Sequence, residues 1–232
     1  MIDLSRTLGD LVTEDPRRAG VLEDLGVDYC CHGQRSLAEA SREQGLDAVA
    51  VAAKLDLPDR EASPSWQALG MAALTDHIEE IHHGYLWHEL GRLGQLVSKV
   101  YSVHGERHPE LAQVYRDYAE LSNELALHLQ KEERILFPAI RSLDGRADGQ
   151  GEGCGVLGPI RQMMFEHDHA GELLASLRAT TGGYAMPEDG CESYRHMLLR
   201  LEEMEGDLHE HIHKENNVLF PRALEADAAR SA

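Results

Sequence analysis

Long apolar runs, period-two alternation and a charged-then-apolar N-terminal leader are all missing from this sequence. A membrane-spanning helix needs about 18 consecutive apolar residues, and a secreted protein needs a leader, so neither class is expected. Without sustained alternation of apolar and polar residues, a sizeable β-sheet is also excluded. We therefore expect a soluble, all-α protein in the cytoplasm.

Basic residues are scarce. The chain of 232 residues has 22 Lys and Arg against 41 Asp and Glu, for a formal net charge of −19. Such a chain repels polyanions, so neither nucleic acid nor an anionic membrane is expected as a partner. The plainest interpretation of the acidic surface is solubility.

Cysteine is also rare, with Cys30, Cys31, Cys154 and Cys191 as the only four. This falls short of the density of a disulfide-stapled domain, so reduced thiols are expected. Adjacent cysteines are difficult to join to each other but suit thiol exchange or metal ligation. His32, or the start of the following helix, would then lower a thiol pKa. The alternative interpretation is two small buried residues in a turn.

Residues 1–60 are expected to form a small helical domain. Asp15 and Ser36 are the expected starts of two helices, the second with the Ser-x-x-Glu pattern of a capping box. Gly26 and Gly45 are the expected stops. The cysteine pair lies in the loop between these two helices.

Residues 61–232 are expected to form a second domain, an antiparallel four-helix bundle. The segment PDREASP, residues 58–64, has the composition of a linker. Four long helices and a glycine-rich connection should follow. The helices are expected over 65–103, over 109–143, from 159 onward and from after 187 to 225, with the connection over 145–155.

One stretch of the expected bundle is repeated. ELALHLQKEERILFP, residues 124–138, recurs 83 positions later as DLHEHIHKENNVLFP, residues 207–221. Each copy carries His-x-x-x-Glu, and positions four apart share one face of a helix. The terminal prolines of the two copies, Pro138 and Pro221, are expected to end or bend their helices. The two pairs are His128 with Glu132 and His211 with Glu215.

Both pairs continue apolar seams. Steps of three and four back from each histidine meet only apolar or aromatic residues, so the histidines and glutamates should be buried. Burying an ionised carboxylate costs several kcal/mol unless a cation compensates, which suggests a metal ion. The seam residues are Val114, Tyr118, Leu121 and Leu125 before His128, and Met197, Leu201, Met204 and Leu208 before His211.

The remaining two helices each offer a histidine in the seam. His83 precedes His128 by 45 positions and His167 precedes His211 by 44 positions, so the two halves of the bundle should be related by a pseudo-twofold axis. Four imidazoles and two carboxylates give each of two metals two nitrogens and allow both carboxylates to bridge. That donor set favours dinuclear iron or manganese. Zinc is less natural because structural zinc prefers four donors, often with thiolate.

Ligating imidazoles usually donate their second N–H to a carboxylate or carbonyl. Glu124 and Asp207, one turn before His128 and His211, are the expected acceptors, and Glu166 is a weaker candidate. The other interpretation of Glu124 and Asp207 is an exposed acidic face. The histidines outside the repeat pattern are expected at the surface. They are His77, His82, His88, His104, His169, His209 and His213.

The segments DYCCHG, EIHHGYL, HLQKEERILFP, FEHDHAGELL and HIHKENNVLFP together resemble the di-iron iron–sulfur cluster repair family, also called repair of iron centres. The resemblance covers almost the whole chain. It implies an N-terminal Cys-Cys module at Cys30 and Cys31 with a role in redox or transfer, followed by a hemerythrin-like domain. The implied iron ligands are His83, His128, Glu132, His167, His211 and Glu215, the set already reached from phase and repeat.

The resemblance also implies a function. Such a protein restores iron–sulfur clusters damaged by nitrosative or oxidative stress, with damaged or apo iron–sulfur proteins as partners and two iron ions, with room for an oxo or hydroxo bridge, as the cofactor. Two alternatives stay open: a sensor or carrier of oxygen or nitric oxide, and a redox enzyme acting on nitrogen oxides. Whether the chain is an enzyme, and whether it is a monomer or a homodimer, stays open as well.

Overall fold

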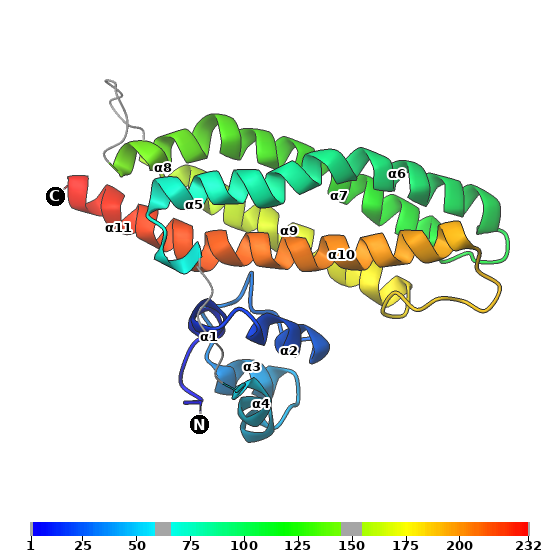
Figure 1. Cartoon of the computed structure of the whole chain (residues 1–232), viewed down its shortest axis with the longest axis horizontal. Coiled ribbons are helices and arrows are strands. Elements are labelled where there is room, and N and C mark those ends of the chain that lie inside the picture. Colours follow the sequence, from blue (N-terminus) through cyan, green and yellow to red (C-terminus); the bar gives the residue numbers. More distant parts are fainter. Residues whose placement is uncertain (1, 59–65, 145–154, 232) are drawn as a thin grey trace.

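The computed structural model describes residues 2–58, 66–144 and 155–231, and these are almost entirely helical (Figure 1). Within these ranges the only β-type pairing is one isolated bridge between Thr7 and Ser36. The expected all-α class is therefore confirmed. No helix in the described ranges is long and apolar enough to cross a membrane.

Four long helices run up and down to form the bundle (Figure 1). Each lies beside the next in sequence, and the last closes against the first. The first comprises α5 (Met71–Ile78), η2 (Glu79–His83) and α6 (Gly84–His104) after a short turn η1 (Trp66–Ala68), and the second comprises α7 (Leu111–Lys131), η3 (Glu132–Leu136) and α8 (Phe137–Leu143). The third is α9 (Leu157–Thr180), and the fourth comprises α10 (Glu192–Lys214), η4 (Glu215–Leu219) and α11 (Phe220–Ser231).

The apolar seams form the core of the bundle, as their spacing predicts. All eight seam residues before His128 and His211 are buried. They pack with the corresponding faces of α6 and α9 into one cluster. Burial of such side chains stabilises the fold by about 1.5–3 kcal/mol each. This cluster ends where the six candidate ligands begin, and a second cluster, built around Phe137 and Phe220, closes the other side.

The prediction was that the two prolines end or bend their helices, and the first alternative is wrong because both helices continue past them. A wider π-helical turn, η3 or η4, precedes each of them. Pro138 and Pro221 are consequently the second residues of α8 and α11. Proline has no N–H to donate to the preceding turn, and in both copies it lies two residues after the end of the widened turn.

The N-terminal module packs four short helices around its own core. Ser36 and Glu39 form the expected capping box, and Gly26 and Gly45 adopt the positive φ expected at helix ends. Asp15, in contrast, is not the start of the second helix, which begins at Arg18, but follows the end of the first. The helices are α1 (Leu8–Glu14), α2 (Arg18–Asp24), α3 (Leu37–Glu43) and α4 (Ala48–Leu55).

The module lies against the α10 side of the bundle (Figure 1). Asn217 of η4 reaches into it and donates through Nδ2 to the carbonyl oxygen of Cys30 at 2.9 Å. Gly9 and Gly33 make room for this side chain, since a Cβ at either position would approach its Oδ1 to 2.6 Å or 2.2 Å. The bundle and the module are thus joined by a side chain of η4 that packs directly against the backbone of the module.

Some predicted features lie outside the described ranges. They are the linker from residue 59 on, the boundary between 60 and 61, the predicted helix start at 65, and residues 145–154 of the glycine-rich connection with Cys154.

Candidate metal centre

The six predicted ligands converge in the middle of the bundle. One comes from η2, two from the end of α7 and the start of η3, one from α9, and two from the end of α10 and the start of η4. Their side chains are all at most 4% exposed. They are His83, His128, Glu132, His167, His211 and Glu215.

Each glutamate spans two histidines. The Oε2 atom of Glu132 lies 3.4 Å from Nε2 of His83, and its Oε1 lies 3.2 Å from Nε2 of His128. Glu215 likewise places Oε2 3.1 Å from Nε2 of His167 and Oε1 3.2 Å from Nε2 of His211. A carboxylate with its two oxygens facing different imidazoles is arranged as a bridge.

The donors form two groups that could each hold a metal ion. His83 and His211 belong to one group, His128 and His167 to the other, and both groups contain both glutamates. Within a group, the donor atoms lie within 4.8 Å of one another. The two groups thus share both carboxylates, and all of their donor atoms are nitrogen or oxygen.

The hydrogen bonding of the donors fits a metal as well. All four carboxylate oxygens and the Nε2 atoms of His83 and His211 are buried without a hydrogen-bond partner. Nε2 of His128 and Nε2 of His167 face each other at 3.1 Å. Buried polar atoms are costly when unpaired, and a cation held by each donor group would satisfy all of them.

Three of the imidazoles have an acceptor at the opposite nitrogen. Nδ1 of His128 lies 2.8 Å from Glu166, Nδ1 of His83 lies 3.1 Å from Glu133, and Nδ1 of His167 lies 2.9 Å from the Oδ1 atom of Asn216. A proton on Nδ1 leaves the Nε2 lone pair directed at the metal position.

The prediction that Glu124 and Asp207 accept from the ligating imidazoles is therefore wrong. Glu124 is exposed and lies 3.4 Å from His169, while Asp207 accepts from His82 at 2.8 Å. Glu166, the weaker candidate, takes the role at His128. Glu133 and Asn216 were missed, although they too are related by the offset of 83 positions, and that correspondence could have identified them.

His211 is different from the other three imidazoles. Its Nδ1 has no hydrogen-bond partner, and its ring stacks on that of His82 at 5.5 Å between centroids. His82 is itself held between Asp207 and the buried Lys214, whose Nζ lies 2.7 Å from Nε2 of His82.

The expectation that the non-repeat histidines are at the surface is wrong for three of them. His82, His104 and His213 are buried.

The donors compensate each other electrostatically in the metal-free protein. Burial would lower the pKa of His128, but Glu132, Glu166 and Glu215 raise it to about 10. Burial and Glu215 would raise the pKa of Glu132, yet the neighbouring imidazoles lower it. Burial would raise the pKa of Glu166, but His128, Lys131 and Gln162 lower it to about 2, so Glu166 is an ionised acceptor at neutral pH. The carboxylates therefore remain available as anionic metal ligands.

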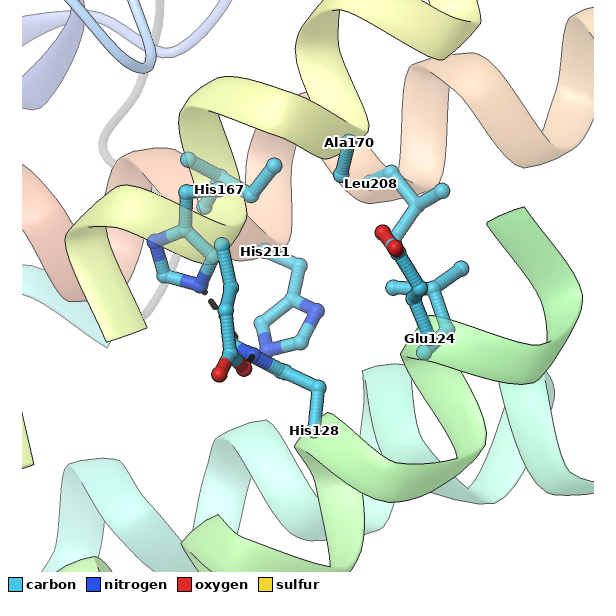
Figure 2. A pocket seen from close by; sticks show the side chains of 9 residues that line it. Glu124, His128, His167, Ala170, Leu208 and His211 are labelled. Carbon is cyan, nitrogen blue, oxygen red and sulfur yellow. Dashed lines mark hydrogen bonds and ion pairs between the residues drawn. The ribbon is translucent and has the colours of Figure 1, made fainter. Parts of the chain in front are cut away.

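A small cavity adjoins the donors. Its volume is about 10 Å³, roughly the space of one water molecule. Figure 2 shows His128, His167 and His211 directed toward one another, with Glu124, Ala170 and Leu208 on another side of the cavity. Since Glu124 is exposed, this cavity lies between the donors and the surface.

The cysteine pair lies in the predicted loop but closer to the metal centre than the linker suggested. Sγ of Cys31 is 3.5 Å from the carbonyl oxygen of His167. The three described cysteines are free thiols, as expected. The expectation of a lowered thiol pKa is wrong for Cys30: the Cys31 thiol, burial and Asp28 raise its pKa. His32 does not counter this, because its Nδ1 pairs with Asp28 at 2.6 Å.

Comparison with known proteins agrees with this arrangement. Residues 68–223 match the hemerythrin HHE cation binding domain, and residues 4–58 match a domain of unknown function, DUF542. The chain is 37% identical to the iron-sulfur cluster repair protein YtfE of Citrobacter koseri and 37% identical to that of an Enterobacter species. It is 36% identical to that of Escherichia coli. In each case the alignment covers 94% of this chain and 96% of the relative. The chain therefore belongs to the iron–sulfur cluster repair family, with a hemerythrin HHE cation binding domain that supplies the bundle.

Proposed function

We propose that the six donors hold two iron ions bridged by Glu132 and Glu215, and that the chain repairs iron–sulfur clusters damaged by nitrosative or oxidative stress. The observation that carries this proposal is the pair of donor groups that share both carboxylates. The names of the relatives, which are iron-sulfur cluster repair proteins, support the second part.

The donor set favours iron over zinc. All six donors are nitrogen or oxygen, and both carboxylates serve two sites, which suits a dinuclear iron centre. When bound, iron supplies one-electron redox chemistry at the centre and is at the same time the cargo that a damaged cluster lacks. Glu133, Glu166 and Asn216 orient the imidazoles toward the metal positions by holding their Nδ1 protons.

A second candidate function is reversible binding of a small gas, nitric oxide or oxygen. The observation that favours it is the cavity beside His128, His167 and His211, which has room for a water-sized molecule next to the donors. A diatomic gas is larger than water, so the lining side chains would have to shift to admit it. In that case the iron would stay on the chain, and the N-terminal module would be a contact for another protein.

Metal analysis tests the centre. Protein purified without added metal should contain two irons per chain, and Glu132→Ala or Glu215→Ala should lose most of that iron, because each carboxylate serves both positions. His169→Ala is the matched control on α9, since His169 is partly exposed and lies outside both donor groups. Zinc or manganese in place of the two irons of the six-donor centre, or full iron in both glutamate variants, would contradict the assignment.

A repair assay tests the function. The iron-loaded chain is mixed with an iron–sulfur enzyme that nitric oxide has inactivated, and enzyme activity and the location of iron are followed together. Recovery of activity with iron moving to the enzyme supports repair. A reversible gas adduct without loss of iron would instead favour the sensor, and repeated turnover of nitric oxide with a reductant would favour a redox enzyme.

A further inference from the structure

The thiol pair at the boundary of the two domains has the spacing of metal ligands. The two Sγ atoms are 3.8 Å apart, and Sγ of Cys30 is 3.4 Å from Oδ1 of Asp28. A tetrahedral ion with metal–sulfur bonds of about 2.3 Å and metal–oxygen bonds of about 2.0 Å separates its ligands by about 3.8 Å and about 3.5 Å respectively. The three donors, all within 4.8 Å of one another, thus form most of a tetrahedral site.

This loop is held in place from several sides. Oδ1 of Asp28 accepts the backbone N–H groups of both Cys30 and Cys31 at 3.0 Å. His32 fixes the other carboxylate oxygen, and Asn217 holds the carbonyl oxygen of Cys30. A rigid loop that already presents its donors loses little conformational freedom when a ligand binds.

An acidic cavity gives access to the thiols. Its volume is about 310 Å³, and it lies between the N-terminal module and helices α9 and α10. Its described lining residues include one guanidinium, that of Arg178, which pairs with Glu205, and one imidazole, that of His209, which pairs with Glu23. The lining carboxylates are more numerous: Glu23, Asp28, Glu172 and Glu205. The excess of carboxylates lowers the local potential and attracts cations.

We propose that Asp28, Cys30 and Cys31 bind one thiophilic divalent cation of the class of Zn²⁺ and Fe²⁺, with the fourth position open to the cavity. Two metal–sulfur bonds form, the two S–H protons go to solvent, and no electrons are transferred. This second metal site is separate from the six-donor centre and goes beyond the proposed function. It would exist whether or not the chain repairs clusters.

Cobalt(II) is the probe that distinguishes the two centres. It is added under reducing, anaerobic conditions to the iron-loaded full chain carrying Cys154→Ser and Cys191→Ser, so that only the adjacent pair remains. We expect one cobalt ion per chain with a thiolate-to-cobalt charge-transfer absorption, which nitrogen and oxygen donors cannot produce. Adding Cys30→Ala and Cys31→Ala should abolish this absorption.

Asp28→Asn is the finer variant. The amide oxygen can still accept both backbone N–H groups, so the loop should keep its shape while cobalt affinity falls at least tenfold. Helical circular dichroism and the iron content of each variant verify its fold.

As a second measurement, Zn²⁺ should slow alkylation of Cys30 and Cys31 by iodoacetamide. Cobalt bound without the charge-transfer absorption, absorption that survives without the pair, or alkylation unaffected by Zn²⁺ would overturn the proposal. None of these readouts depends on repair activity, so failure here leaves the proposed function standing.

Discussion

The four imidazoles of the candidate centre occupy two unequal environments. On one side, Glu166 accepts from His128 and also contacts Lys131. The position related to Glu166 by the pseudo-twofold axis is His82, which contacts Lys214 and stacks on His211. His128 therefore has a carboxylate as its neighbour, whereas the neighbour of His211 is another imidazole.

Both metal positions have one imidazole with a carboxylate acceptor, His128 with Glu166 and His83 with Glu133. The second imidazole has an amide acceptor at His167 and none at His211, so the position near His128 should be the stronger iron site.

Removing the Glu166 carboxylate tests whether the two metal positions differ in their affinity for iron. Glu166→Ala should weaken iron binding about 10–100-fold, the usual effect of deleting a partner that orients a ligand. The loss should fall on one of the two irons, because His83 and His211 do not contact Glu166. Competition with a chelator, followed by the iron remaining per chain, measures it.

Glu124→Ala is the matched control for this variant. Glu124 lines the same small cavity, but its described contact is to the partly exposed His169 rather than to a ligand. It should keep iron as tightly as the unaltered chain. Equal iron loss from the two variants would mean that the charge of the cavity, and not the hydrogen bond to His128, determines affinity.

At this scale the sequence predicted which six side chains converge, but not which residues hydrogen-bond to them. Phase and repeat suffice for His128 and His211 because apolar neighbours three and four residues away specify the buried face. The acceptors depend on which carboxylate a rotamer places beside Nδ1, and helical spacing does not determine that. Glu124 is in the right phase on its own helix, yet the acceptor comes from a residue on α9.

At the scale of helices, the two π turns η3 and η4 help to explain how consecutive residues serve one imidazole. Glu132 and Glu133 contact Nε2 and Nδ1 of His83, and Glu215 and Asn216 do the same for His167. In a regular α-helix neighbouring residues point about 100° apart. The wider π turn begins at Glu132 and at Glu215, as is common for such turns at functional sites. Nothing in the residue pattern indicates a π turn, and the sequence predicted only that the prolines end or bend their helices.

The contact between η4 and the N-terminal loops requires a residue without a side chain at Gly33. A Cβ on Gly33 would lie 2.2 Å from Oδ1 of Asn217 and 2.5 Å from the carbonyl oxygen of Tyr29, which is backbone and cannot easily move. Gly33→Ala should therefore lower the free energy of unfolding by about 1–3 kcal/mol, the usual cost of overpacking. Urea denaturation measures the change.

Gly20→Ala provides the comparison. Gly20 lies within α2 and has no heavy atom near its Cβ position, so alanine there should raise stability by about 0.5–1 kcal/mol. A Gly33→Ala variant as stable as the unaltered chain would show that the module does not pack on η4 in this way.

At the scale of the whole molecule, the N-terminal module packs on the metal-binding bundle rather than standing apart from it. Asn216 accepts from His167 through Oδ1 and lies 3.5 Å from the carbonyl oxygen of Cys30 through Nδ2, so one side chain connects a metal ligand to the cysteine loop. The composition of residues 58–64 suggested two separate units. Composition reports the flexibility of a linker but not the surfaces that it brings together, so this contact could not be predicted.

The last prediction concerns the division of work between the two domains. The six donors of the bundle include no sulfur, and the thiols approach the centre only through backbone, with Cys31 beside the carbonyl oxygen of His167. A Cys30→Ser, Cys31→Ser variant should therefore keep both irons in the bundle and the helical fold. Its defect should appear in the reactivation of a damaged iron–sulfur enzyme, because losing the thiols removes the handle for transfer without weakening a ligand of the centre.

Iron content and reactivation must be measured on the same preparation of this double variant, beside Cys191→Ser as a control thiol that is exposed. Full reactivation of the damaged enzyme by the double variant would show that Cys30 and Cys31 serve only the packing of the loop. Loss of bundle iron would show that the cysteine loop supports the centre through Asn216. Retained iron with lost repair is the result expected if the bundle stores the ion and the loop passes it on.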